Sequence, residues 1–373
     1  MILKIYPSYT TDFTKIHGYL PDAMSCKVAE ERNGTFDLEM EYPLSGIRYD
    51  ELAEGAIILS SHDDSKAEQP FRIYSIERNM RTAKAKARHS VQMVLQRMPV
   101  RPYPRNSQTV ASVMTALNSM SSGWAAQYPS CAIQFSTDIT ASLTYPKALP
   151  GYVLPFIVGE EGSIVDKIKR GEVKYSANGI MLMESRGNDT GITIEYGKNI
   201  SEITGQTSTG ECYTGAYLYH MVDNRIKHSK LYYYDIGSQT VMNDMPNIQE
   251  VDITSEFDTQ PDTSAAFETV ADAYAAKLEA KQPWANLYNN ISVSWYELSR
   301  LPEYSYLPRR MIRLCDTVRV VYPAFGLDKT VKVVKTVWDP LAERYEKIEL
   351  DSLKKPLHST IRGIVSSTVR RMF

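Results

Sequence analysis

The chain has 373 residues, which is enough for two or three domains of ordinary size. Hydrophobic residues make up 43% and charged residues 23%, a composition that excludes global disorder and low-complexity classes. With 42 Lys and Arg against 44 Asp and Glu, the net charge of −2 gives no overall field to hold nucleic acid or an anionic membrane. The 25 tyrosines favour a sheet-rich protein with contact surfaces.

Strand patterns dominate the first hundred residues. Apolar and acidic side chains alternate over residues 35–43, which predicts a half-buried strand, and Asn33-Gly34 predicts a hairpin with residues 25–30. Further strands are expected at residues 56–60, 71–78 and 82–89. Because three prolines between residues 99 and 104 mark a linker, we expect residues 1–99 to form a first β-barrel domain.

The middle of the chain mixes helix and strand signals. Apolar residues from Val110 to Met120 follow helical spacing behind Asn106-Ser107 as cap candidates. A second short helix is predicted from Ser163, with Gly171 placed to end it, before strands at 179–185 and 192–196. Residues 100–190 are therefore predicted to be a mixed α/β domain.

One more helix interrupts the later strands. Phe267, Ala271, Tyr274 and Leu278 lie on one helical stripe that Pro283 closes, which predicts a helical insertion at 263–283. Residues 191–262 and 284–373 would form a second β-barrel domain. The predicted fold class is mainly β with α+β parts: two related β-barrel domains plus a mixed α/β domain and the helical insertion.

Three strands near the start have counterparts of similar pattern near the end. Residues 55–60 match 316–321 and residues 82–87 match 343–348 at an offset of 261, and residues 71–76 match 331–336 at 260. Another alternating strand precedes each trio, at 36–42 and 291–298. We interpret this as an internal duplication, with an accidental match of two meanders as the alternative. Two similar units per chain in a ring of three would make a quasi-sixfold ring, able to stack on a true sixfold partner.

Several ordered motifs resemble one family. The motifs are Glu30–Gly34 before Leu38–Pro43, then Gln69–Tyr74, Tyr196–Asn199, Asp316-Thr317 behind Cys315, and Trp338-Asp339 with Glu343–Tyr345. With these motifs in this order, the chain resembles the phage minor structural proteins of the prophage tail ("endopeptidase tail") family over roughly residues 1–355. Cys315 departs from the glycine more usual there. The motif positions, all expected to be structural, are Tyr42, Pro43, Phe71, Arg72, Tyr196, Gly197, Lys198, Asn199, Asp316, Thr317, Trp338, Asp339, Arg344 and Tyr345.

This resemblance implies a tail-tip or baseplate hub, similar to the hub of contractile-phage baseplates. Such a hub is a homotrimer whose two barrel domains per chain form a ring under a hexameric distal tail protein. Its implied partners also include tape-measure and tip, fibre or receptor-binding proteins. DNA would pass through the lumen without sequence-specific binding, and the protein would be made in the host cytoplasm and reside at the virion tail tip.

The sequence predicts neither an enzyme nor a cofactor. Longer family members carry a lytic domain after the hub portion, whereas this chain stops 23 residues past Leu350. His-Glu-x-x-His and Gly-x-Ser-x-Gly motifs are absent, and the four cysteines lie too far apart for a metal knuckle. No secretion signal or membrane span is expected, since the most apolar stretch, 148–159, is short and broken. A cell-wall-degrading tail peptidase or a glycan receptor-binding module remains the alternative.

Three weaker candidates have simpler interpretations. His220 and His228 could bind a metal but lack a third ligand nearby. Asp63, Asp64 and Glu68 could bind calcium, but they lack the alternating spacing of a calcium loop, which favours a mobile hairpin tip. The basic run of Arg78, Arg81, Lys84, Lys86 and Arg88 predicts a strand with a solvated charged face, with DNA or an acidic neighbour as the functional alternative. The glycines at 191 and 197 enclose an alternating strand, so we expect a Gly-Lys-Asn turn there and no phosphate loop.

Overall fold

The structure, a computed structural model, describes residues 2–100, 107–144, 151–160, 162–195, 197–207, 212–223, 225–235, 246–257, 260–280, 288–295, 303, 311–322 and 327–350. The chain divides into two compact units. Unit 1 contains Met1–Ile203 and Ser292–Asp351, and unit 2 contains Thr204–Ile291. No helix among the described residues is long and apolar enough to cross a membrane.

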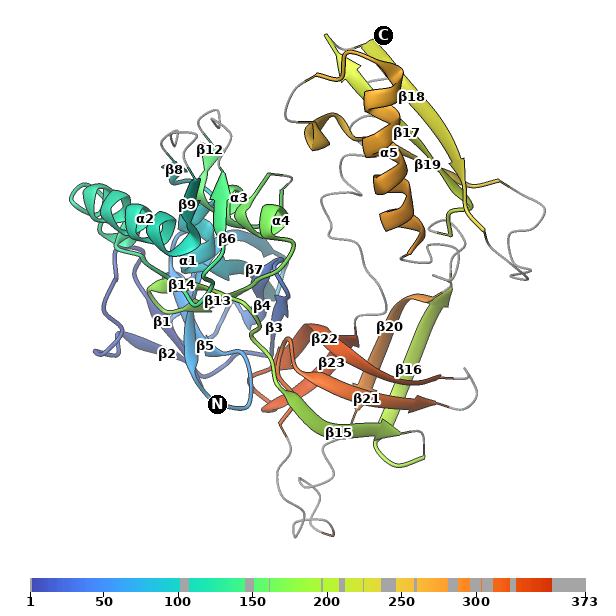
Figure 1. Ribbon diagram of the computed structural model, residues 1–373. Coiled ribbons are helices and arrows are strands. Elements are labelled where there is room, and N and C mark those ends of the chain that lie inside the picture. The colour runs from blue at the N-terminus through green and yellow to red at the C-terminus, as the bar shows by residue number, and fades with distance from the viewer. Residues whose placement is uncertain are drawn as a thin grey trace. The chain divides into compact units, whose positions relative to one another are not determined.

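Unit 1 opens with an antiparallel sheet, the first module (Figure 1). Its strands are β1 (Leu3–Tyr6), β2 (Gly18–Leu20), β3 (Ser25–Glu31), β4 (Phe36–Pro43), β5 (Ile57–Ser61), β6 (Glu68–Arg78) and β7 (Thr82–His89), in the order β3-β4-β7-β6-β5-β1-β2. The predicted hairpin joins β3 to β4, and Asn33 takes a positive φ of 57° in its turn. The strands predicted from alternation are therefore confirmed.

Short helices and strands follow and share the core of this sheet. The helices are α1 (Ser90–Leu95), α2 (Val110–Ala125), α3 (Val153–Ile157), α4 (Ile164–Ile168) and the 3-10 turns η1 (Tyr49–Glu51) and η2 (Pro129–Cys131). The strands are β8 (Pro99–Val100), β9 (Ser107–Thr109), β10 (Gln134–Thr137), β11 (Ser142–Thr144), β12 (Gly151–Tyr152), β13 (Glu172–Ser176) and β14 (Gly179–Met183). Thr109 caps α2 in place of the expected Asn106-Ser107, because its hydroxyl accepts the Ser112 N–H at 3.1 Å. Ser163 caps α4 as predicted.

The end of the chain builds the second module. Its strands are β15 (Asp189–Glu195), β16 (Ile200–Thr207), β20 (Tyr288–Trp295), β21 (Thr317–Tyr322), β22 (Leu327–Asp339) and β23 (Arg344–Leu350). They follow the order β16-β20-β23-β22, with β21 on β22 and β15 on β21. The spatial order in this module is thus β16-β20-β23-β22-β21-β15. If the strands of each module are ranked by their position in the chain, this order is the same as β3-β4-β7-β6-β5-β1 in the first module. The predicted duplication is thus confirmed at the level of strand order.

Local details of the two modules also correspond. An extra residue bulges out of the ladder at Tyr74 in β6 and at Val334 in β22, which are 260 positions apart. Gly55, with φ of 88°, donates its N–H to the carbonyl of Ile73, and Cys315, with φ of 72°, donates to Val333. Cys315 therefore holds a left-handed position that favours glycine, which is the residue usual in the motif.

The register corrects two of the sequence offsets. Ile58 faces Phe71 where Val318 faces Val331, so the first strands correspond at 260 and not at 261. The third strands correspond at 263, because the connection between β22 and β23 is two residues longer than that between β6 and β7, and a second bulge at Glu346 adds one more residue to β23. One pairing also differs, since β1 runs antiparallel to β5 whereas β15 runs parallel to β21.

The expectation of two closed barrels needs correction. In the described part of the chain the strands form one open thirteen-stranded sheet whose path ends at β2 and β16. The two modules are joined within this sheet by the antiparallel pairing of β22 with β3. The mainly β fold class with a mixed α and β region is confirmed.

Unit 2 is a small sheet covered by one helix (Figure 1). It contains β17 (Gly215–Val222), β18 (Arg225–Tyr233), β19 (Ile248–Asp252), η4 (Thr254–Glu256) and α5 (Ser264–Glu279), with the strand order β18-β17-β19. Phe267 and Ala271 of α5 pack on Leu218 of β17. The predicted helix is confirmed, and the Thr263 hydroxyl caps it by accepting the N–H of Ala266.

A buried histidine in the core of the first module should make stability depend on pH. His89 stacks on Phe36 with ring centroids 4.8 Å apart, and its Nε2 lies 3.1 Å from Gln69 Oε1. Burial, with a smaller contribution from the charge of His62, lowers the pKa of His89 to about 3. The unfolded chain binds this proton below about pH 6.5 and the folded chain does not.

The free energy of unfolding is therefore expected to fall as the pH drops from about 6.5 toward 3, by up to about 1.4 kcal/mol per pH unit from this group. Urea unfolding of the wild type and of His89→Gln at several pH values measures the effect, because glutamine does not titrate. Equal pH dependence of the two proteins would contradict a neutral, buried His89.

Candidate assembly site: the junction of the two modules

The junction is the line along which β22 pairs with β3. Lys335 faces Glu31, Trp338 faces Val28, and the N–H of Arg32 donates to the carbonyl of Val334 at 2.8 Å. β22 is long enough to pair with β21 over its first half and with β3 over its second half. The junction therefore extends a ladder of backbone hydrogen bonds from one module into the other.

Trp338 makes the largest apolar contribution to the junction. It is 1% exposed and belongs to the core cluster of the first module, although it comes from the second. Its indole Nε1–H donates to Ser61 Oγ at 3.2 Å, so its polar atom is satisfied. Tyr345, across the β22–β23 hairpin, meets the indole edge-on with centroids 4.8 Å apart. Burial raises the pKa of Tyr345 well above its usual value.

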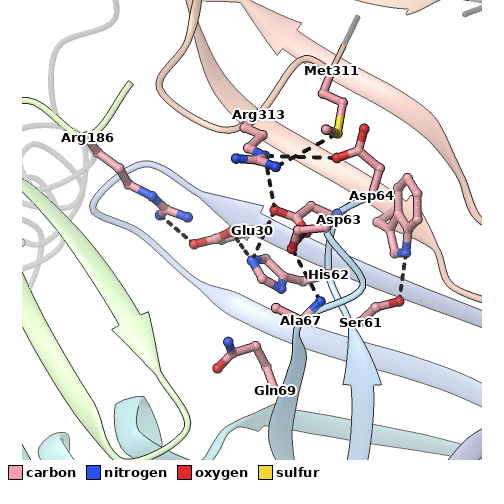
Figure 2. A network of polar contacts seen from close by, with 12 residues as sticks. Glu30, Ser61, His62, Asp63, Asp64, Ala67, Gln69, Arg186, Met311 and Arg313 are labelled. Atoms are coloured by element: carbon pink, nitrogen blue, oxygen red, sulfur yellow. Dashed lines mark hydrogen bonds and ion pairs between the residues drawn. The ribbon is translucent and has the colours of Figure 1, made fainter. Parts of the chain in front are cut away.

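A buried ion pair lies beside this apolar contact. Figure 2 shows Glu30 of β3 between Arg186 and His62. Arg186 Nη1 lies 2.6 Å from Glu30 Oε1, with side-chain exposures of 11% and 5%, and His62 Nε2 lies 3.9 Å from Glu30 Oε2. Desolvation opposes the charge of Arg186, but the attraction of Glu30 and their hydrogen bond outweigh it and raise the pKa of Arg186.

The loop between β5 and β6 completes the network (Figure 2). Arg313 Nε lies 3.7 Å from Asp63 Oδ2 and 3.9 Å from Asp64 Oδ1, and Glu68 pairs with Lys4 at 2.7 Å. Asp64 is only 9% exposed at its side chain. Residues 63–64 thus lie in the connection between β5 and β6, as expected, and their carboxylates face the Arg313 guanidinium, so the calcium candidate gains no support. The described residues contain no group of three or more His, Cys, Asp or Glu placed to hold a metal.

A second acidic residue ties the mixed region to the junction. Glu172 at the start of β13 lies 2.6 Å from Lys332 Nζ of β22 and 3.8 Å from Arg32 Nη1. Its other carboxylate oxygen accepts the backbone N–H of Arg186 at 2.8 Å. Both modules and the mixed region thus meet at two buried carboxylates, Glu30 and Glu172.

The motif residues of the first module support turns and the core. Tyr42 is buried and donates its hydroxyl to the carbonyl of Ile47 at 2.6 Å, and Pro43 ends β4. Phe71 lies in the core, and Arg72 donates to the carbonyls of Ser8 at 2.7 Å and Gly55 at 3.0 Å. Burial lowers the pKa of Arg72, with a further contribution from Arg97.

The motif residues of the second module do the same. Asp316 accepts the N–H of Asn188 at 2.9 Å and of Arg313 at 2.7 Å, and the N–H of Thr317 donates to the Asn188 carbonyl. Asp339 accepts the N–H groups of Leu341 and Ala342, both at 2.9 Å. Arg344 faces Asp339 across the β22–β23 hairpin. These contacts fix the start of β21 and the hairpin.

The glycine-containing motif forms a tight connection between β15 and β16. Gly197 has a positive φ of 81°, Lys198 pairs with Glu195, and Asn199 Oδ1 accepts the N–H of Glu195 at 2.8 Å. The expected turn is confirmed, and Tyr196 lies outside the described residues.

The basic run is a balanced ladder of ion pairs. Lys84 lies 2.6 Å from Glu39, and Arg88 lies 2.7 Å from Asp37 on the neighbouring strand β4. Lys86 pairs with Glu77 of β6. The intervening Ala83, Ala85 and Ala87 are buried, which confirms a strand with one charged face. Since acidic neighbours offset these charges, the face gives little support to DNA binding.

The two histidines of unit 2 belong to its core. His220 and His228 face each other across β17 and β18 with ring centroids 6.2 Å apart. Phe257 and Phe267 pack against them. Burial lowers the pKa of His220, with a smaller contribution from His228. In this part of the structure no third ligand joins the pair, so the metal candidate gains no support.

A close backbone approach at the junction gives a testable position. A Cβ added to Gly187 would overlap the carbonyl oxygen of Cys315, next to Arg186 and Asp316. Gly187→Ala is therefore expected to destabilise the protein by about 1–3 kcal/mol or more, because the backbone must shift. Gly123→Ala is the control, since nothing lies within 4 Å of the added Cβ on α2.

The control variant should gain up to about 1 kcal/mol, because alanine favours a helix over glycine. Thermal unfolding of both variants measures the difference. A neutral Gly187→Ala would show that the backbones of residues 187 and 315 are farther apart than in the structure.

No pattern in the sequence marks Arg186, Arg313 or Glu172 as junction residues. Arg186 contacts Glu30 across 156 positions and Lys332 contacts Glu172 across 160. A single charged residue in a strand or loop carries no pattern that identifies such a distant partner. Of the residues in these two ion pairs, Glu30 is the one that the sequence singles out, because it belongs to the Glu30–Gly34 motif.

Comparisons with known proteins agree with this architecture. Residues 188–361 match the sequence model of the prophage endopeptidase tail family. In structure the chain is similar to the tail protein from Neisseria meningitidis MC58, with TM-score 0.56, 10% identity, and coverage of 94% of this chain and 95% of that one. It is also similar to prophage tail protein gp18 from Listeria monocytogenes EGD-e, with TM-score 0.54, 13% identity, and coverage of 98% and 99%.

A third similar structure is the 43 kDa tail protein of prophage MuSo2 from Shewanella oneidensis, with TM-score 0.58, 9% identity, and coverage of 94% and 97%. Comparison with curated proteins by sequence gives no match. The resemblance to the prophage tail family is confirmed, and the chain has the fold of phage and prophage tail proteins.

Proposed function

We propose that the protein is a structural component of a phage or prophage tail, a trimeric hub at the tail tip. The observation that carries this proposal is the repeated strand order, β3-β4-β7-β6-β5-β1 and β16-β20-β23-β22-β21-β15, within one chain. Three copies with two such modules each present six similar units. A ring of this kind matches a sixfold distal tail ring on one face and threefold tip proteins on the other.

The role is mechanical. Every described motif residue serves a turn, a strand pairing or the core, and the junction network consists of ion pairs that hold elements together. The matched family and the similar tail structures support a tail component. DNA would pass through the centre of the ring without sequence-specific contacts, and tape-measure and fibre or receptor-binding proteins would be the neighbours.

Mass measurement by light scattering of the purified chain, alone and mixed with its distal tail ring, tests the proposal. The expected mass is that of three chains, at least in the mixture, and electron microscopy of the mixture should show the chain stacked on the ring. A monomeric mass in both samples would overturn the trimer. Clearing of peptidoglycan by the purified chain would instead favour a cell-wall hydrolase.

A further inference from the structure

One strand edge is occupied in the second module and free in the first. Residues 335–338 of β22 pair with β3 on one edge and with β23 on the other. Their counterparts 260 positions earlier are residues 75–78 of β6. These pair with β7 on one edge, while β5 covers only residues 68–72 of the other edge. Among the described strands none pairs with the outer edge of residues 75–78.

The strand on the other side of this contact also has two counterparts, of which one is paired on both edges and the other on one edge. β3 has β4 on one side and β22 on the other. Its counterpart by strand order is β16, which ends the path of the sheet and has β20 as its one neighbour there. The contact between modules inside the chain therefore uses β22 and β3, and leaves their counterparts β6 and β16 available.

We propose that residues 75–78 of β6 pair with β16 of a second copy of this chain, as β22 pairs with β3 within one copy. The inference rests on the proposed oligomeric hub and specifies its interface. Such a contact joins two different surfaces, so its repetition around an axis closes a ring and leaves no open sheet edge at this position. Main-chain hydrogen bonds between strand edges would supply much of the affinity.

The edge of β6 is suited to this role. Residues 75–78 contain no proline or lysine, which are two of the residues that natural edge strands use to prevent pairing. The side chains of Glu77 and Arg78 are held by Lys86 and by the Tyr49 hydroxyl, at 2.9 Å in the latter case. A second copy is the occupant because its β16 occupies the place in the second module that β3 occupies in the first.

Disulfide trapping in the full-length chain tests this pairing. Glu77→Cys is combined in turn with a cysteine at each residue from Ile200 to Thr207, because residues directly opposite on paired strands have Cβ atoms about 4.5–5.5 Å apart. After mild oxidation, non-reducing gels are expected to show most of the chain as covalent dimers and trimers for at least one combination. Reduction should return them to monomers.

Two controls accompany the scan. The single variants Glu77→Cys and Ser201→Cys should give no trimers, since each provides one half of the contact. Glu77→Cys with Tyr19→Cys places the second thiol on β2, the strand at the opposite end of the sheet, at a residue that is 44% exposed. This pair should not cross-link, and cross-linking equal to that of the scan would overturn the proposal as non-specific.

Light scattering of each protein before oxidation separates the two ideas. A trimer that shows no cross-link at any position of β16 overturns the β6–β16 contact and leaves the proposed hub standing. A monomer at all concentrations and in mixture with the distal ring overturns the hub itself. A trimer with specific cross-links supports both.

Discussion

Trp338→Ala is expected to destabilise unit 1 by about 3–5 kcal/mol, because a fully buried indole leaves a cavity that its surroundings fill only in part. The loss should be concentrated at the junction, since Trp338 joins the second module to the core of the first and bonds to Ser61. Urea unfolding followed by circular dichroism gives the change in free energy. Amide hydrogen exchange along β3 shows whether the junction opens before the rest.

The matched control is Trp124→Ala on α2. Trp124 is 36% exposed and lies at the end of its helix, so the same substitution should cost far less. Equal losses for the two variants would contradict the special place of Trp338. A large loss of stability in Trp338→Ala without faster amide hydrogen exchange in β3 would show that Trp338 stabilises parts of the protein other than the junction.

Arg186→Met is the second variant with a large expected effect. It leaves the carboxylate of Glu30 buried with its main partner removed, which is expected to cost about 3–5 kcal/mol. The remaining neighbour is His62 at 3.9 Å, and it provides only part of the lost interaction. Urea unfolding of the variant and of the wild type measures this loss.

Two further variants make the result interpretable. The double variant Glu30→Leu with Arg186→Met removes both charges and should recover much of the stability, since apolar pairs often replace buried ion pairs at little cost. Arg319→Met makes the same substitution in an exposed pair with Asp328 and should leave the unfolding midpoint unchanged. If Arg186→Met and Arg319→Met behave alike, the Glu30–Arg186 pair is solvated and the junction is less tight than described.

Local patterns were enough to find part of the elements, whereas the strands of unit 2 were not predicted. Alternation located β4 and β7, helical spacing located α2 and α5, and side-chain caps placed the start of α4 at Ser163. The duplication can be recognised in the sequence because strands that bury one face alternate apolar and polar residues, and three such strands recur near the end of the chain with nearly the same separations as near its start. The predicted offset was off by one residue for the first strands and by two for the third strands, where a longer hairpin connection and a bulge at Glu346 add residues in the second module only.

Tertiary structure decided how the repeated parts are joined. A sequence that predicts two similar sheets does not say whether each closes into a barrel or whether one edge pairs with the other, because backbone hydrogen bonds are the same in both cases. The pairing of β22 with β3 depends on Trp338 entering a distant core, and the buried carboxylate of Glu30 pairs with Arg186, 156 positions away. Strand and helix periods come from neighbours in the chain, whereas these contacts come from neighbours in space.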